Sequence, residues 1–412
     1  MIEFDKFALN NGLQVIVHKD NTTPLVAVNI LYKVGARNES PDRTGFAHLF
    51  EHLMFGGSVN IPSYDEPLQL VGGENNAFTT NDLTNYHLTL PANNIETAFW
   101  LESDRLLGLA FTEKSLEVQR NVVTEEFRQR YLNQPYGDVW LELRPLAYKV
   151  HPYQWATIGK SIEHITGATM QEVKDFFFSY YAPNNAIMVV AGNIETENVK
   201  LLADKWFGNI PNRNILNNVI PQEPEQNETR RLLLERDVPM DAIYIAFKMP
   251  EKLHNDYKLL DIISDLLGNG KSSRLFQKLV MDSKLFGDVE CYITGSVDIG
   301  LLIVEGRINE GASFEVAENA IFEVINALLL NVSETELQRV INKAEATLTY
   351  SYIDVLNKAT SLAFYEMLGD ANLINTEIIE YQKVTIAEIK SAITKYLKIE
   401  HASILQYKSI KN

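Results

Sequence analysis

Residues 26–34 of this chain have the sequence VAVNILYKV, which is typical of a buried strand. Residues 241–249, with the sequence DAIYIAFKM, match it at an offset of 215 positions. A second match joins residues 48–54, HLFEHLM, to residues 261–267, DIISDLL, at an offset of 213 positions. Because the two offsets nearly agree and lie close to half of the 412 residues, we predict two similar domains in tandem.

A stretch rich in Asn, Pro, Gln and Glu separates the two repeats. Within it stand Pro211, Pro221 and Pro224, and proline lacks a backbone donor and interrupts both helices and strands. We therefore expect an interdomain linker here. The predicted boundaries are an N-terminal domain at 1–208, a linker at 209–231 and a C-terminal domain at 232–412.

The first half contains short apolar runs and longer helical stretches in an irregular order. We expect strands over Leu13–His18, Ala27–Val34, Thr84–Leu90 and Ala186–Ala191. We expect helices over Gly45–Met54, Asn94–Leu107, Glu113–Tyr131 and Thr169–Tyr180. This order differs from the strict alternation of a doubly wound parallel sheet. The fold class that we predict is α+β, with two homologous domains, each a mostly antiparallel or mixed sheet packed with helices.

The composition excludes several classes of protein. Hydrophobic residues make up 46% of the chain, which supports a full core and rules out a disordered protein. The 37 basic and 54 acidic residues give a net charge of −17, whereas a nucleic-acid binder would carry a basic excess. The longest apolar runs fall far short of the roughly 18 residues that span a bilayer. We therefore expect no nucleic-acid partner and no membrane segment.

The cysteine count and the N-terminal residues indicate the cellular compartment that we expect. The single cysteine, Cys291, rules out an intramolecular disulfide framework and a zinc cluster built from cysteines, and it fits a reducing compartment. Residues 1–11 show no basic segment followed by an apolar run, so no secretory signal is visible. We expect a cytoplasmic protein, or a periplasmic one if a signal has been removed.

The sharpest motif is HLFEH, from His48 to His52. Residues four apart share one face of a helix, so these two histidines could hold one ion together, with Glu51 beside them in the H-x-x-E-H order. Such a trio could also face solvent by chance. Here apolar residues flank it, and burying ionisable groups without a partner is costly. The flanking residues are Phe46, Leu49, Phe50, Leu53, Met54 and Phe55. We therefore predict a site for a divalent metal ion.

A catalytic zinc site has three protein ligands and an open position, so a third ligand is needed. The predicted helix Glu113–Tyr131 contains two adjacent carboxylates, Glu125 and Glu126. Glu126 lies on the inward stripe of this helix, whereas Glu125 lies on its polar side. We trace that stripe through Leu116, Gln119, Val122, Val123 and Phe127. Helical geometry therefore favours Glu126 as the ligand and Glu125 as a solvated or structural carboxylate.

Taken together, these features resemble the pitrilysin/insulinase family of zinc peptidases, especially its short members similar to the mitochondrial processing peptidase β-subunit. The resemblance covers nearly the whole chain, and several motifs carry it. They are residues 11–15 (NGLQV), 32–39 (YKVGARNE), 45–55 (GFAHLFEHLMF), 75–80 (NNAFTT), 84–86 (TNY) and 120–126 (RNVVTEE).

The resemblance implies a zinc metalloendopeptidase. It gives His48, His52 and Glu126 as zinc ligands and Glu51 as the general base, which takes a proton from water and passes it to the leaving amine. It also implies an edge strand that aligns an extended peptide substrate by backbone pairing. The residues that match this strand are Asn76, Ala77, Phe78 and Thr79.

The chain departs from the family pattern near the ligands and in the second repeat. Family members commonly carry another Glu seven residues before the ligand Glu, and Gln119 occupies that position here. A glutamine can still hydrogen-bond a ligand, but it supplies no charge. In the second repeat Asp261, Ser264 and Asp265 replace the His, Glu and His of the motif, so we expect no metal there.

A further departure concerns substrate binding. Active members carry an Arg and a Tyr in the C-terminal domain that hold the substrate near the zinc. After the recognisable motif of residues 272–279 (SSRLFQKL), these positions hold Val280 and Gly287. The resemblance also implies that short chains supply half of a catalytic chamber. We therefore expect a heterodimer with a related chain that supplies the Arg and Tyr, with a homodimer as the alternative.

Two other functions compete with this hypothesis. One is a non-catalytic structural subunit, but such relatives generally lack an intact metal motif. The other is a metal-retaining binding or scaffold subunit with little turnover, which the loss of the Arg and Tyr allows. The substrate and the cleavage preference are not encoded in any motif, and the same N and O ligands accept several divalent ions.

Overall fold

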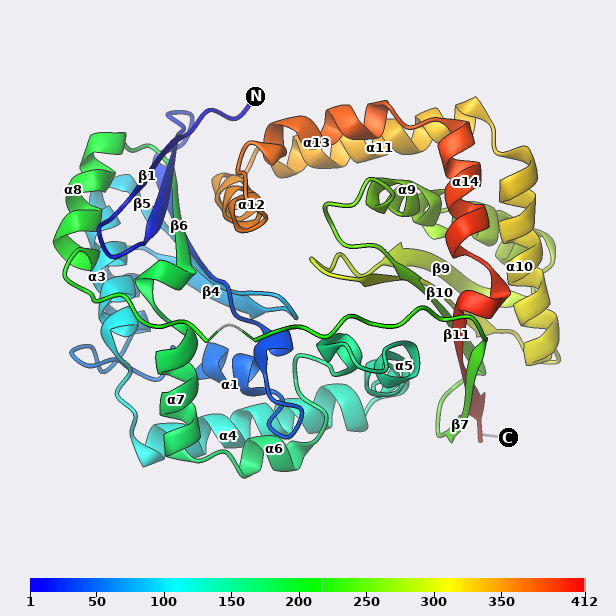
Figure 1. The fold of residues 1–412 in the computed structure, drawn as a ribbon, viewed down its shortest axis with the longest axis horizontal. Coiled ribbons are helices and arrows are strands. Elements are labelled where there is room, and N and C mark those ends of the chain that lie inside the picture. Colours follow the sequence, from blue (N-terminus) through cyan, green and yellow to red (C-terminus); the bar gives the residue numbers. More distant parts are fainter. Residues whose placement is uncertain (217, 411–412) are drawn as a thin grey trace. The chain divides into compact units, whose positions relative to one another are not determined.

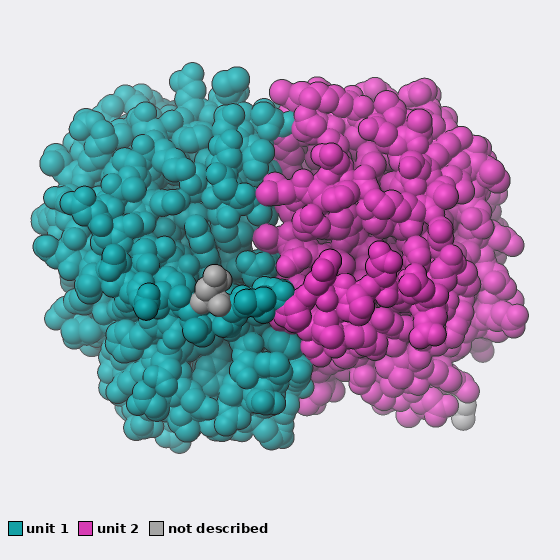
Figure 2. All heavy atoms as spheres, viewed as in Figure 1, with its two compact units in different colours: residues 1–129, 155–220, 349–376 teal, residues 130–154, 221–348, 377–412 magenta. Residues whose placement is uncertain are grey.

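The computed structural model describes residues 1–216 and 218–410, and Asn217 of the predicted linker lies outside them. The chain forms two compact units (Figure 2). The first unit comprises residues 1–129, 155–220 and 349–376, and the second comprises 130–154, 221–348 and 377–412. The units therefore differ from a simple division at the linker, because residues 130–154 belong to the second unit and residues 349–376 to the first.

The first unit is built on a six-stranded sheet in the order β1-β2-β6-β3-β5-β4. Strands β2 and β6 run parallel, and the other neighbours are antiparallel. Strand β4 stands at one edge and pairs only with β5 among the described residues. The strands are β1 (Asp5–Ala8), β2 (Gln14–Lys19), β3 (Leu25–Tyr32), β4 (Glu74–Thr79), β5 (Thr84–Pro91) and β6 (Ala186–Gly192).

Helices cover both faces of this sheet. Figure 1 shows α3 and α8 together on one side and α12 on the other. Helix α12 comes from late in the chain and packs on β3 and β6, where Asn29 Nδ2 donates a hydrogen bond to Thr360 Oγ1 at 3.1 Å. The helices of this unit are α1 (Phe46–Leu53), α2 (Asp65–Leu70), α3 (Ile95–Leu107), α4 (Glu113–Phe127), α6 (Ile162–Thr166), α7 (Met170–Tyr180), α8 (Thr196–Phe207) and α12 (Val355–Met367).

The second unit has a five-stranded sheet in the order β7-β11-β8-β10-β9. Its strands are β7 (Arg230–Arg236), β8 (Ala242–Met249), β9 (Phe286–Ile293), β10 (Gly300–Ile308) and β11 (Ala402–Ser409). Its helices include α5 (Val139–Ala147), α9 (Tyr257–Gly268), α10 (Phe314–Asn331) and α14 (Ile386–Tyr396). Helices α11 (Glu334–Ser351) and α13 (Leu373–Gln382) run across the boundaries between chain segments.

The two sheets repeat one topology. The order β2-β6-β3-β5-β4 in the first unit corresponds to β7-β11-β8-β10-β9 in the second, and β7–β11 is parallel like β2–β6. Strand β3 corresponds to β8, and α1 to α9, as the two sequence matches predicted. The prediction of two α+β domains in tandem, each with a mixed sheet packed with helices, is confirmed.

The predicted linker is more closely attached than its composition suggests. Strand β7 already begins at Arg230, inside the predicted range, and the described residues from 211 to 229 form neither helix nor strand. Glu223 is buried and accepts hydrogen bonds from the backbone N–H groups of Lys149, Val150 and His151 at 2.9, 3.0 and 3.1 Å. Lys248 Nζ pairs with the same carboxylate at 2.7 Å. These bonds fix the second part of the linker to the second unit.

Among residues 1–216 and 218–410, no single helix is both long and apolar enough to span a membrane. Helices α10 and α11 meet the length and composition criteria only when taken together, and a bend of 104° separates them.

Candidate metal centre

The centre is built on α1, the short helix that carries the HLFEH motif. Its apolar residues face the core, and Phe46, Leu49 and Phe50 are buried. The opposite side presents His48 and His52, whose side chains are 13% and 25% exposed. The helical spacing of the motif thus divides one face for packing from one face for ligands.

Helix α4 brings the third group to these histidines. Glu126 Oε2 lies 3.4 Å from His52 Nε2 and 3.7 Å from His48 Nε2, and the glutamate side chain is 17% exposed. One ligand atom from each of the three residues lies within 4.8 Å of the others. Ligand atoms about 2.0–2.1 Å from a tetrahedral zinc ion would be roughly 3.3 Å apart. Two imidazoles and one carboxylate at these distances therefore fit a zinc ion.

Glu51 directly precedes His52 on α1, and its side chain is connected to the edge strand. Thr79 Oγ1 donates a hydrogen bond to Glu51 Oε2 at 2.5 Å. Along β4, Ala77 and Thr79 are half-buried, whereas Asn76 and Phe78 alternate with them and are exposed. Since successive side chains of a strand point to opposite faces, Ala77 and Thr79 share the side of the sheet that meets α1.

The two adjacent glutamates of α4 occupy different environments. Glu125 is 57% exposed and forms an ion pair with Arg128, whereas Glu126 lies at the histidines. The predicted inward stripe was wrong at Val122, which is 45% exposed, while Thr124 is buried instead. Val122 lies one turn before Glu126, at the open margin of the helix, so an apolar side chain there does not indicate core packing.

The rest of the predicted helix 113–131 concerns Gln119 and the place where the α-helix ends. Gln119 is half-buried on α4, two turns before Glu126. The predicted helix 113–131 ends as an α-helix at Phe127 and continues as a five-residue π-helical turn, Arg128–Leu132.

Two groups around α1 were not predicted from the sequence. At its start, the buried carboxylate of Glu39 accepts hydrogen bonds from Gly45 N and Ala47 N. Near the other end of α1, Phe55 packs against Arg105 of α3. Arg105 is fully buried, pairs with Glu102 and stacks on aromatic rings. Its guanidinium lies 5.5, 4.6 and 4.4 Å from the ring centroids of Phe55, Tyr64 and Tyr86. The motif 32–39 contains Glu39, but nothing in its sequence indicates a contact with the start of α1.

The second unit has different chemistry at the corresponding positions of α9. Asp261 is hydrogen-bonded to the Tyr381 hydroxyl, and burial raises the pKa of this carboxyl. Asp265 lies 4.0 Å from Lys343 Nζ. Of the two positions that the resemblance assigns to Arg and Tyr, Val280 packs against the second core and Gly287 is exposed on β9.

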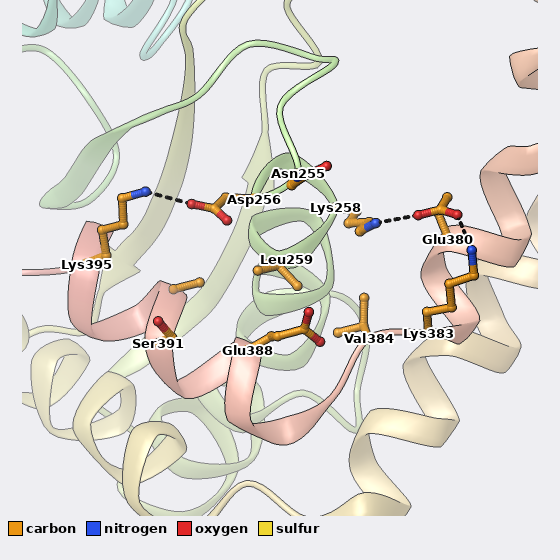
Figure 3. A pocket seen from close by; sticks show the side chains of 11 residues that line it. Asn255, Asp256, Lys258, Leu259, Glu380, Lys383, Val384, Glu388, Ser391 and Lys395 are labelled. Atoms are coloured by element: carbon orange, nitrogen blue, oxygen red, sulfur yellow. Dashed lines mark hydrogen bonds and ion pairs between the residues drawn. The ribbon is translucent and has the colours of Figure 1, made fainter.

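A cavity of about 380 Å³ lies in the second unit, between the start of α9 and helices α13 and α14 (Figure 3). Its lysines are all paired: Lys258 and Lys383 share Glu380 at 2.9 and 2.5 Å, and Lys395 pairs with Asp256 at 2.8 Å. None of the metal-site residues lines it.

Comparisons with known families and with individual proteins all point to the same kind of protein. Residues 14–154 match the family described as insulinase (peptidase family M16), and residues 167–344 match the peptidase M16 inactive domain. The first match contains the histidines and Glu126. The second contains Asp261, Ser264 and Asp265, so its description agrees with their replacement of the HxxEH residues.

Individual relatives extend this similarity over most of the chain. Zinc protease PqqE of Helicobacter pylori is 32% identical over 370 residues, covering 87% of this chain and 81% of that protein. The probable mitochondrial-processing peptidase subunit beta of Arabidopsis thaliana is 22% identical over 355 residues, covering 82% of this chain and 66% of that protein. The crystal structure of a protease from Helicobacter pylori matches with a TM-score of 0.92 and 27% identity, covering 99% of this chain and 100% of that one.

Proposed function

This chain belongs to the insulinase family of peptidases, peptidase family M16, and on that premise we propose that it is a zinc-dependent metalloendopeptidase. The observation that carries the proposal is the convergence of His48, His52 and Glu126, with Glu51 on the same helix as the two histidines. Three protein ligands with an adjacent carboxylate are the arrangement that zinc peptidases use. Relatives that are named zinc proteases support the same activity.

The residues of the site have separate tasks in this proposal. A zinc ion held by His48, His52 and Glu126 would polarise the scissile carbonyl and make water more acidic. Glu51 accepts a proton from the attacking water and returns it to the leaving amine. Thr79 orients the Glu51 carboxylate by its hydrogen bond.

The edge strand β4 is the proposed binding place for the peptide substrate. Its outer backbone groups have no partner strand among the described residues, so an extended peptide can add to the sheet there. Because Thr79 at the end of β4 contacts Glu51, a peptide paired with residues Asn76, Ala77, Phe78 and Thr79 would pass close to the general base.

We further propose that this chain is the metal-bearing half of a two-chain chamber. Val280 and Gly287 supply no charge or hydroxyl where the family resemblance expects an Arg and a Tyr. A related chain would supply that pair in a heterodimer, and a homodimer is the alternative. A relative named as a subunit, the probable processing peptidase subunit beta, supports a multi-chain assembly.

The test of the proposed activity is direct. The purified chain is loaded with Zn²⁺, its metal content is measured, and cleavage of a mixed peptide library is followed by mass spectrometry with and without 1,10-phenanthroline. We expect about one zinc ion per chain and cleavage that the chelator abolishes and Zn²⁺ restores. A chain that takes up no zinc contradicts the proposal.

The same Val280 and Gly287 favour a second candidate function, a metal-retaining binding or scaffold subunit with little turnover. A chain that binds zinc and peptides, yet cleaves no peptide alone or with a related chain, would support this candidate over the endopeptidase.

A further inference from the structure

The start of the metal helix α1 lacks a cap of its own. Its N-cap residue is Gly45, which has no side chain to accept a hydrogen bond from the first turn. The first N–H groups of a helix have no partner within the helix, so another group must satisfy them. The carboxylate of Glu39 does this, accepting from Gly45 N at 2.9 Å and from Ala47 N at 2.8 Å.

This capping carboxylate is buried and itself fixed. Glu39 is 6% exposed, and the indole N–H of Trp155 donates to Glu39 Oε2 at 3.1 Å and to the Ala36 carbonyl at 2.9 Å. Burial raises the pKa of Glu39 to about 8, although the hydrogen bonds from Ala47, Gly45 and Trp155 act in the opposite direction. The fold therefore keeps a costly buried carboxyl at this helix start.

The backbone around Gly45 leaves little room for movement. Gly45 has a φ of +88°, and a Cβ at this position would lie 2.6 Å from the carbonyl oxygen of Ile158. The preceding Thr44 donates its N–H to His164 Nδ1 at 3.1 Å and accepts a hydrogen bond from Lys160 N at 2.8 Å. The entry into α1 is thus held from several sides, and Glu39 is the side chain that accepts hydrogen bonds from its first N–H groups.

Several other helices among the described residues are capped by the side chain of their own N-cap residue. Thr112 caps α4, Thr169 caps α7 and Thr385 caps α14, each through its own side chain. Helix α1 has only eight residues, and short helices depend on their contacts for stability. Its first ligand, His48, lies one residue after Ala47, so a shift of the first turn moves a ligand directly.

We propose that Glu39 is a positioning residue of the metal site, which holds the first turn of α1 so that His48 and His52 meet Glu126. The inference rests on the proposed zinc function of these three residues. In this role Glu39 acts through the backbone of α1. Metal sites lose affinity when the groups that orient their ligands are removed.

The experiment compares Glu39→Gln with a matched control, Glu388→Gln. Glu388 is also a carboxylate at a helix start, where it accepts from Thr385 N at 2.9 Å, but its helix α14 carries no predicted ligand. Zinc affinity is measured by competition with a chromophoric chelator. The visible spectrum of the Co²⁺-loaded protein reports ligand geometry. In the metal-free protein, hydrogen exchange of the Gly45 and Ala47 amides reports the first turn.

We expect Glu39→Gln to weaken zinc binding about tenfold, to alter the Co²⁺ spectrum and to speed exchange at Gly45 and Ala47. Glu388→Gln should leave zinc affinity and the Co²⁺ spectrum unchanged. A purely structural role would lower the melting temperature of Glu39→Gln while leaving the affinity and spectrum as in the wild type, and that result would overturn the inference.

Two further outcomes are distinguishable. If Glu39→Gln does not fold, Trp155→Phe, which removes one donor to the same carboxylate, decides: weaker zinc binding supports the inference, and wild-type binding overturns it. If the wild-type protein itself takes up no zinc, the proposed function fails and the inference fails with it. If the wild-type protein binds zinc and Glu39→Gln binds it equally well, the inference about Glu39 is overturned while the proposed function stands.

Discussion

Thr79 donates a hydrogen bond to Glu51 at 2.5 Å and thereby connects the edge strand β4 to α1, the helix that carries His48 and His52. The two residues come from elements that are separate in the chain, and the bond joins the proposed substrate strand to the proposed general base. A peptide that adds to β4 would therefore be placed relative to the base by the sheet itself. Positioning of this kind reduces the entropy that a reaction must otherwise overcome.

The first prediction concerns Glu51. Glu51→Gln should keep its zinc, because the ligands are His48, His52 and Glu126, but it should lose cleavage by about a hundredfold or more, because an amide cannot accept the proton. Zinc content and kcat/KM on one peptide, measured on the same preparation, check this. An empty metal site in the variant, or activity near that of the wild type, would contradict the role of Glu51.

The second prediction concerns Thr79. Thr79→Val removes the hydroxyl and keeps the shape, so it should lower kcat by about tenfold while zinc content is unchanged, in the range of a lost hydrogen bond to a charged group. Thr79→Ser keeps the hydroxyl and should restore most of the activity. If valine and serine variants behave alike, the hydrogen bond to Glu51 has no part in catalysis.

The third prediction separates the neighbouring carboxylates of α4. Glu126→Gln should strip most of the zinc, because the 3.4 and 3.7 Å contacts place this side chain at the histidines. Glu125→Gln is the matched control and should change zinc affinity little, because Glu125 is exposed and pairs with Arg128. Equilibrium dialysis of both variants gives the comparison. Zinc loss in the Glu125 variant alone would reverse the assignment.

Sequence reasoning selected the three residues that the structure brings together, because its rules are local. The spacing of His48 and His52 alone places them on one helix face, and Glu126 was separated from Glu125 by helical position. The same reasoning misplaced Val122, since an apolar side chain at the margin of an open site has no distinguishing local pattern. Gly45 and its distant cap Glu39 could not be connected, because a turn between them decides which backbone N–H groups the carboxylate meets.

The domain plan shows the same limit. Two sequence matches were enough to predict the repeated sheet, because β3 and β8 are both buried apolar strands. The membership of residues 349–376 in the first unit was not predictable in this way. It depends on long-range contacts, such as the ion pair between Lys358 of α12 and Asp20, which no local periodicity encodes.

The fourth prediction concerns pH and Glu336 in the second unit. Arg274 binds this carboxylate through Nε and Nη2 at 2.9 and 2.8 Å, and Ser333 adds two more hydrogen bonds. The hydrogen bonds from Arg274, followed by those from Ser333, lower the pKa of Glu336 from 4.5 to about 2. A carboxyl whose pKa is lower in the folded than in the unfolded state stabilises the fold at pH values above its unfolded-state pKa. This stabilisation is lost as the pH falls through its folded-state pKa.

Glu336→Gln should therefore lower the free energy of unfolding at neutral pH, and its difference from the wild type should shrink between pH 4.5 and pH 2. Urea unfolding at several pH values measures this difference. Glu334→Gln, an exposed glutamate of the same helical turn, is the control and should show no such narrowing. A difference for Glu336→Gln that stays constant down to pH 2 would contradict the assignment of the ion pair.

The last prediction concerns assembly. If a related chain must supply an Arg and a Tyr, this chain alone should cleave peptides poorly at every concentration, and adding that chain should raise kcat/KM by more than about tenfold, as expected for hydrogen bonds to a charged group. If the chain acts as a homodimer, its specific activity should instead rise with its own concentration, alongside the mass measured by light scattering.

A gain-of-function variant makes this test independent of finding the partner. Val280→Arg combined with Gly287→Tyr restores both side chains within this chain. Gly287 is exposed on β9, and the nearest atom to an added Cβ is Asn309 Oδ1 at 3.3 Å, so the strand can accept a larger residue with a small adjustment. Val280 is half-buried against the second core, so replacing it disturbs packing there. The single variant Gly287→Tyr leaves Val280 in place and separates the effect of the tyrosine from that disturbance.

Under the missing-pair hypothesis, the double variant should cleave peptides faster than the wild type at equal zinc content. Full activity of the unmodified chain alone, with no gain in the double variant, would remove the reason for a heterodimer, because Val280 and Gly287 would then cost the enzyme nothing.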